Sequence, residues 1–180
     1  MAELSAQGPV LGAHATSVAS SDVAVAVGTR MRDKDGNEYI YCTFGETLTA
    51  GQWVYIRQPS AVLRVATTST GPIGIVCASV TSTDNGWVQI YGDYATAQIS
   101  NSEATSAFRL LAPTGATTEA ALAASSTDDV ANLVHGAWIT AAASTDTTGS
   151  SSAHSGITVA VRLNYPQVLN ISVNTSPGST

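Results

Sequence analysis

Two neighbouring stretches of the chain have alternating patterns: Ile73, Ile75 and Cys77 alternate with smaller residues, and Trp87, Gln89 and Tyr91 alternate with Val88 and Ile90. An alternation with a period of two is typical of β-strands, because successive side chains point to opposite faces. Residues 81–86 separate the two stretches, and Asn85 and Gly86 are residue types that adopt the positive φ of tight hairpin loops. The pattern predicts a β-hairpin that buries Ile75 and Trp87 in the main core.

A second hairpin is predicted from residues 22–44. The sequence DVAVAV at residues 22–27 alternates strictly, and residues 33–37 (DKDGN) have the composition of a turn. The return strand would place Tyr39, Tyr41 and Thr43 on one face and Ile40, Cys42 and Phe44 on the other.

Strand patterns recur through the rest of the chain, at residues 53–57, 62–66, 93–100, 108–113, 134–141, 157–163 and 168–173. Two weak helical patterns lie at residues 117–124 and 128–134. Turn signals about every 8 to 12 residues favour an antiparallel arrangement. The predicted fold is therefore mainly all-β, a small antiparallel β-barrel or sandwich with short helices and an extended amino-terminal arm.

The domain organisation follows from changes in composition. Residues 1–21 are rich in Ala, Ser and Gly and form the arm; residues 22–173 form a single β-rich domain; residues 174–180 form a flexible tail. The domain contains an irregular or helical insertion at about residues 101–134 and a Ser/Thr-rich loop at residues 142–156. A neutral arm is suited to lying along a partner's surface, with Val10, Leu11 and Val18 as candidate anchors, although a frayed terminus is the alternative.

The charge balance restricts the classes of partner. The net charge is −6 with seven basic residues, and no basic cluster occurs, which argues against nucleic-acid binding. Charged residues make up only 11% of the chain, so its surface is built from small neutral side chains that are easily desolvated in repeated assembly. No apolar run has the length of a membrane span, and no cleavable signal sequence is recognised.

Candidate chemistry is sparse. His14, His135 and His154 are dispersed, and no catalytic or cofactor motif occurs, so the sequence predicts neither an enzyme nor a bound cofactor. Cys42 and Cys77 lack metal-site spacing and are interpreted as small core residues, with a disulfide between them as the alternative.

Residues 33–44 superficially resemble a calcium-binding loop through Asp33, Asp35 and Asn37. The sixth position is Glu38 instead of glycine and the twelfth is Phe44 instead of glutamate, so no metal site is predicted.

The segments ETLTAGQWVYIR (residues 46–57) and GPIGIVCASVTSTDNGWVQIYG (residues 71–92) resemble the small β-proteins that decorate the heads of tailed bacteriophages. GAWITAAA and VAVRLNYPQV, at residues 136–143 and 159–168, resemble the same capsid decoration, or cement, proteins. The resemblance implies a virion structural protein, made in the host cytoplasm, that binds the major capsid protein on the capsid surface. It also implies many copies, self-association into homo-oligomers such as trimers, and head stabilisation by bridging of neighbouring capsid subunits.

A carbohydrate-binding or adhesion module of a phage tail or fibre is the alternative function. It would use aromatic residues on predicted strands, which the sheet core would otherwise bury: Tyr39, Tyr41, Trp53, Tyr55, Trp87 and Tyr91.

Overall fold

The computed structural model describes residues 25–59, 61–66, 68–99, 111–113, 122–124, 132–141 and 157–170. Within these ranges the chain forms ten β-strands and no helix. The strands are β1 (Arg30–Arg32), β2 (Glu38–Thr43), β3 (Trp53–Gln58), β4 (Ala61–Arg64), β5 (Gly71–Val76), β6 (Asn85–Ile99), β7 (Leu111–Pro113), β8 (Leu122–Ala124), β9 (Asn132–Ile139) and β10 (Ile157–Asn170). The predicted all-β, mainly antiparallel fold is confirmed.

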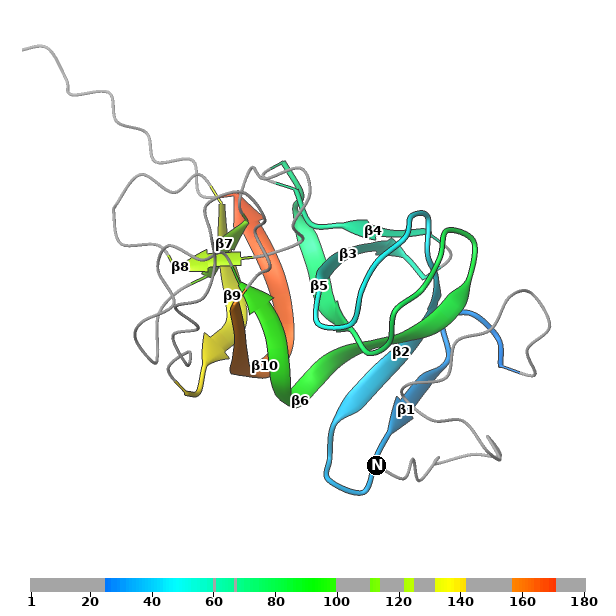
Figure 1. Ribbon diagram of the computed structural model, residues 1–180, viewed down its shortest axis with the longest axis horizontal. Helices are drawn as coiled ribbons and strands as arrows, with labels where there is room; N and C mark the ends of the chain where they lie inside the picture. Colours follow the sequence, from blue (N-terminus) through cyan, green and yellow to red (C-terminus); the bar gives the residue numbers. More distant parts are fainter. Residues whose placement is uncertain are drawn as a thin grey trace, which may run out of the picture.

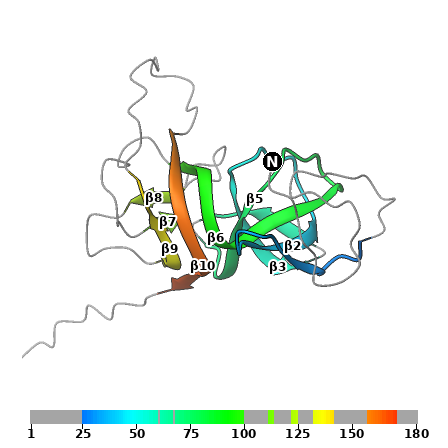
Figure 2. The ribbon, with the colours of Figure 1, turned by 90° about the horizontal axis from the view of Figure 1, so that it is seen from below.

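All ten described strands belong to one sheet, in the order β1-β2-β6-β8-β7-β9-β10-β5-β3-β4. β6 pairs with β2 and β5 along its first half and with β10 along its second half. Figure 1 shows β2 to β5 gathered around one end of β6 and β7 to β10 around the other. In Figure 2, β6 and β10 lie side by side, with β7 to β9 on the side of β10 and β2, β3 and β5 on the side of β6. β6 passes from one group to the other, and the sheet is not closed as a barrel.

The hairpin of β1 and β2 has the predicted turn and the predicted faces. Asp33 organises the turn: its Oδ1 accepts hydrogen bonds from the backbone N–H groups of Asp35 and Asn37, both at 2.9 Å. Tyr39 and Tyr41 pack with Met31 in one cluster, while Ile40, Cys42 and Phe44 belong to another. Both faces of β2 are therefore buried, in separate parts of the core.

The predicted pairing of residues 73–77 with 87–91 is also confirmed. β5 and β6 are antiparallel, with Ile75 opposite Gln89 and Val76 opposite Val88. The predicted loop conformation is wrong, because Asn85 and Gly86 begin β6 and the positive φ, 77°, occurs at Thr83. The Asp84 carboxylate accepts the Thr81 backbone N–H at 3.0 Å and so closes a local turn before the strand starts.

Three further predictions of local structure need correction. Of the strand predicted at residues 22–27, residues 25–27 are not a strand and residues 22–24 lie outside the described ranges; the first described strand begins at Arg30. Leu122–Ala124, the end of one predicted helix, is β8, and Asn132–Ile139, which overlaps the second, is β9. Pairing with β7 and β10 supplies backbone partners that a short, weak helical pattern does not outweigh. The remainder of the insertion, the loop at 142–156, the arm and the tail at 174–180 lie outside the described residues.

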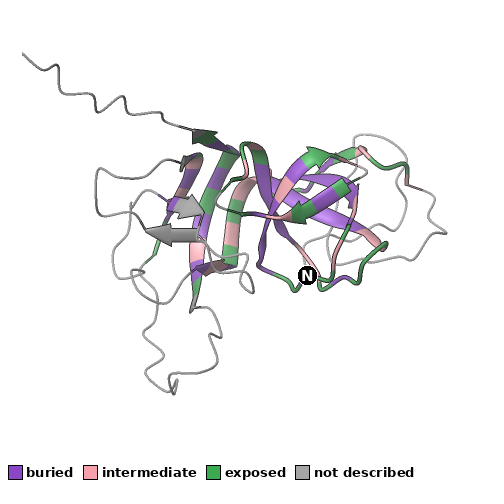
Figure 3. Cartoon of the chain, turned by 90° about the horizontal axis from the view of Figure 1, so that it is seen from above, coloured by how far each residue is buried: buried purple, intermediate pink, exposed green. Residues whose placement is uncertain are grey.

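The buried side chains of the described residues form three clusters. The largest joins β3 and β5 to β9 and β10 and contains Ile75, which is fully buried. Trp87 is also buried, at 2% exposure, but it packs in the smallest cluster beside Tyr41, with ring centroids 4.9 Å apart. Figure 3 shows buried and exposed bands alternating along the strands of the β9–β10 group, which leaves one face of that group open to solvent.

Candidate binding site

The sequence predicted two sets of binding residues, the apolar anchors of the arm and the aromatic residues of the strands. Val10, Leu11 and Val18 lie outside the described residues. The aromatic set does not form a surface, because four of its six members are buried and two are half-buried. The buried four are Tyr39, Tyr41, Trp53 and Trp87, and the half-buried two are Tyr55 and Tyr91.

In the loop that resembles a calcium site, the first carboxylate, Asp33, forms its hydrogen bonds within the turn and with the adjoining strand β2. Asp33 Oδ2 accepts hydrogen bonds from Asn37 Nδ2 at 2.8 Å and from the Tyr39 hydroxyl at 2.9 Å, in addition to the two bonds to Oδ1. Burial alone would raise the pKa of Asp33, but these side-chain and backbone hydrogen bonds outweigh it and hold the pKa below its ordinary value. Asp33 therefore stabilises the turn, and the described part of the chain holds no group of three potential metal ligands.

Of the three histidines in the sequence, one lies among the described residues. His135 is exposed on β9, and His14 and His154 lie outside the described ranges. Cys42 and Cys77 are both free thiols, so they are not joined by a disulfide. Burial raises the pKa of Cys42 to about 12, which keeps this thiol protonated and unreactive at neutral pH. No helix among the described residues is long and apolar enough to cross a membrane.

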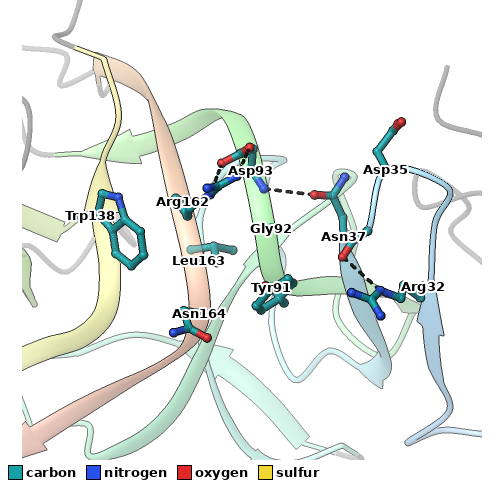
Figure 4. Close-up of a pocket in the computed structure, with 11 residues that line it drawn as sticks. Arg32, Asp35, Asn37, Tyr91, Gly92, Asp93, Trp138, Arg162, Leu163 and Asn164 are labelled. Carbon is teal, nitrogen blue, oxygen red and sulfur yellow. Dashed lines mark hydrogen bonds and ion pairs between the residues drawn. The ribbon is translucent and has the colours of Figure 1, made fainter.

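A groove of about 380 Å³ lies where β6 leaves the β2 group and joins β10. We call it the polar groove; Figure 4 shows its principal lining residues, Arg32, Asp35, Tyr91, Trp138, Arg162 and Asn164. Its floor is the outward face of β9, β10 and β6. On that face Arg162 of β10 stands opposite Trp138 of β9 on one side and Asp93 of β6 on the other.

The Arg162–Asp93 pair fixes the centre of this floor. The guanidinium Nε and Nη2 donate to Asp93 Oδ1 and Oδ2, both at 2.8 Å, in a two-point contact. The hydrogen bonds and charge of Asp93 raise the pKa of Arg162 further. Both side chains are more than half exposed, so the pair sets geometry and contributes little to stability.

The β1–β2 turn forms a wall of the polar groove beside this floor. Asn37 Oδ1 accepts the backbone N–H of Asp93 at 3.0 Å and ties this turn to β6 (Figure 4). The contact needs a glycine at position 92, where φ is +96° and an added Cβ would lie 2.0 Å from Asn37 Oδ1. The Gln89 side-chain amide donates hydrogen bonds to the backbone carbonyls of Tyr91 and Asp93, both at 3.1 Å, and so gives these carbonyls partners at the bend.

A second groove, of about 280 Å³, shares no lining residue with the first. We call it the apolar groove; it is lined mainly by Ile40, Ile56, Pro59, Ile73, Ile90 and Tyr165. Two arginines, Arg30 and Arg57, also line it, and no acidic residue does. The grooves meet at a pair of tyrosine rings, Tyr91 and Tyr165, whose centroids are 5.2 Å apart.

Tyr165 is held in an uncommon backbone conformation, with φ of 48°. Tyr165 as a residue is 44% exposed, and its hydroxyl donates to Glu38 Oε2 at 2.7 Å, which raises the pKa of the phenol. A non-glycine residue at positive φ is rare and persists only where surrounding contacts enforce it. The contacts to Glu38 and Tyr91 fix this ring at the lip of the apolar groove.

The chain matches no protein-family model, no curated protein and no solved structure.

Sequence reasoning missed both grooves. Trp138 falls inside the strand predicted at residues 134–141 without a role in binding, and the sequence predicts no role for Arg162 or Tyr165. One available signal was the pair Gly92–Asp93, because a glycine followed by a charged residue interrupts an apolar alternation and marks a bend or close approach.

Proposed function

We propose that this chain is a virion structural protein that binds the outside of a tailed-phage capsid in many copies. It stabilises the mature shell by bridging neighbouring subunits of the major capsid protein. The resemblance of residues 46–57 and 71–92 to capsid decoration proteins supports this proposal, and the apolar groove is the observation that carries it.

The chemistry of the apolar groove defines the partner it would accept. The protein as a whole has a net charge of −6, yet this groove carries Arg30 and Arg57 and no carboxylate. Its floor of isoleucine and proline side chains would bury apolar residues of a partner. The occupant we propose is an extended segment of the major capsid protein in which apolar residues adjoin an acidic side chain.

The outer strands of the described sheet are less suited to this contact. β1 has three residues, and two of them are arginines. At β4, the backbone N–H of Arg64 already donates to the Glu46 carboxylate, and the Val62 carbonyl accepts the Gly45 N–H at 2.9 Å. Short, charged or capped edges resist strand addition, so we place the capsid contact in the groove.

The stabilising mechanism is thermodynamic linkage. A protein that binds the mature shell, and not its precursor, shifts the equilibrium toward the mature state by RT ln(1 + [L]/Kd) for each site. A copy that contacts two subunits, one through the groove and one through the arm with Val10, Leu11 and Val18, would hold both together. Its two contacts would reinforce each other through their high effective concentration.

The test is co-sedimentation of the purified protein with mature capsids that lack it. Arg57→Glu should weaken binding at least tenfold, about 1.4 kcal/mol, because it reverses the charge beside the apolar floor. Lys34→Glu makes the same change in charge on an exposed turn residue outside the groove and should bind like the unaltered protein.

Deleting residues 2–18 should also weaken capsid binding at least tenfold. It should leave the thermal midpoint of the free protein unchanged, because the few apolar residues of the arm do not repay the entropy of ordering it alone. Binding that survives both Arg57→Glu and the deletion would refute the proposed contacts, and a protein that never sediments with capsids would refute the function.

A further inference from the structure

We propose that the polar groove is a binding site for neutral oligosaccharides. The inference does not depend on capsid binding, since it uses a different surface of the molecule. It returns to the alternative function suggested by the sequence, but places the site on other residues, principally Trp138, Asn164 and Asp35.

The two aromatic side chains of the groove are placed to accept sugar rings. Tyr91 is opposite Asn164 on β10, and Trp138 is opposite Arg162, two residues earlier on the same strand. Tyr91 and Trp138 therefore flank β10 on its two sides. Their Cα atoms are separated by two strand spacings across the sheet and by two residues along it, which amounts to about 12 Å. That separation suits a saccharide of more than one ring. Both side chains are half-buried, so each is held by its surroundings while part of its ring remains accessible.

The groove also presents polar groups that the described structure leaves unused. Neither the Asp35 carboxylate nor the Asn164 amide has a hydrogen-bond partner among the described residues, and the same holds for Trp138 Nε1. Arg32 has only long contacts, 3.4 Å to the Gly36 carbonyl and 3.8 Å to Glu38. In Figure 4 Asp35 and Arg32 lie on one side of the groove, Trp138 lies on the other, and Asn164 lies between them.

These groups match hydroxyls better than any other common ligand group. The indole N–H and the guanidinium only donate, the carboxylate only accepts, and the amide does both. A sugar hydroxyl both donates and accepts, so a row of hydroxyls satisfies such a mixture. Its C–H face meanwhile packs on the aromatic rings, in the pattern of apolar walls with a few placed polar groups that small-molecule sites share.

The charge of the lining selects a neutral ligand. Arg162 is neutralised by Asp93 within the groove, and the positive Arg32 is offset by the negative Asp35. The charged residues of the lining therefore sum to zero, which favours neither an anionic nor a cationic glycan. The two-point Arg162–Asp93 contact orients the floor, and the hydrogen bond from the Asp93 backbone N–H to Asn37 holds the turn beside it, so the groove is formed before the ligand arrives.

The experiment is a titration of the full-length protein with neutral oligosaccharides of two to four pyranose units, built from glucose, galactose or N-acetylglucosamine. One sulfated oligosaccharide is included as a charged comparison. We expect at least one neutral series to bind. Asn164→Ala and Asp35→Asn should each weaken that binding at least tenfold, and Trp138→Ala should abolish it.

Lys34→Ala is the matched control, because Lys34 adjoins Asp35 in the same turn but does not line the groove. Thermal melting of every variant guards against loss of folding, and Asp35→Asn and Asn164→Ala alter exposed side chains only. The proposal is overturned if no neutral oligosaccharide binds at millimolar concentration, if only the sulfated one binds, or if Asn164→Ala and Asp35→Asn bind like the unaltered protein. Capsid co-sedimentation should be the same for Asp35→Asn as for the unaltered protein, so the two proposals fail separately.

Discussion

The two halves of β6 belong to the same strand but serve different purposes. Residues 86–90 are all buried, because β2 and β5 pair on either side and side chains cover both faces. In the second half Ala97 and Ile99 are buried, whereas Asp93, Ala95 and Thr96 are exposed. The first half holds the sheet together, and the second half opens one face on which the polar groove is built.

The bend at Gly92 makes this division possible. Up to Tyr91 the strand is paired with β2, and from Tyr91 onward it is paired with β10. The two halves of β6 therefore have different neighbouring strands. The first half is enclosed by its neighbours, and the second half contributes residues to the polar groove. Substitutions in the first half should therefore reduce stability, whereas those on the open face of the second should affect binding.

The largest effect is expected at Trp87 in the first half. Trp87→Ala removes a fully enclosed indole that packs on Tyr41 and should cost about 3 to 5 kcal/mol of unfolding free energy. Leu169→Ala is the control, because Leu169 is 44% exposed and its loss should cost less than about 0.5 kcal/mol. Urea denaturation measures both, and a Trp87→Ala loss below about 1 kcal/mol would show that this half is not the rigid one.

The bend itself is the next target. Gly92→Ala meets both a positive φ and the side chain of Asn37, whereas Gly36→Ala meets a positive φ of 88° with no atom nearer than 3.8 Å. The positive φ alone should cost about 1 to 2 kcal/mol in either variant. Gly92→Ala should be the more destabilising of the two in urea denaturation, because the Asn37 contact must also break. Equal losses would mean that the close approach at Asn37 is easily relieved.

A third effect concerns Asp33, in the turn that supports the bend through Asn37. Asp33→Asn replaces an acceptor of four hydrogen bonds and should cost about 1 to 3 kcal/mol at neutral pH. Because the folded pKa of Asp33 lies below the unfolded value of about 3.9, its charged form stabilises the protein above that pH. This contribution is lost as the pH falls through the folded pKa.

Urea denaturation from pH 7 down to about pH 2 follows this loss. The difference in stability between the unaltered protein and Asp33→Asn should be constant above about pH 5 and should narrow below about pH 4. Asp35→Asn is the control in the same turn, since its carboxylate is exposed and the change should stay within about 0.5 kcal/mol. A difference that does not change with pH would mean that the charge of Asp33 is not what the turn uses.

The sequence by itself determined which residues form most of the strands and which side chains share a face of β2. Alternation is a local property with a period of two, so residues 39–44 reveal their two faces without knowledge of any partner strand. The buried aromatics of β2, β3 and β6 follow from the same pattern, because large side chains on a strand cover the sheet. Short segments such as Leu122–Ala124 escaped it, because three residues are too few to show a period.

Only the tertiary structure decided the pairing that creates the grooves. Trp138, Arg162 and Asp93 come from three strands far apart in the chain, and their alignment depends on register shifts in β10 between Val159 and Val161 and between Leu163 and Gln167. A shift of one residue would turn Arg162 toward the core and Leu163 toward solvent. Register is set by non-local packing and by bulges, neither of which leaves a periodic mark in the sequence. The core was therefore readable in advance, while the open face and its polar groups became visible only in the folded chain.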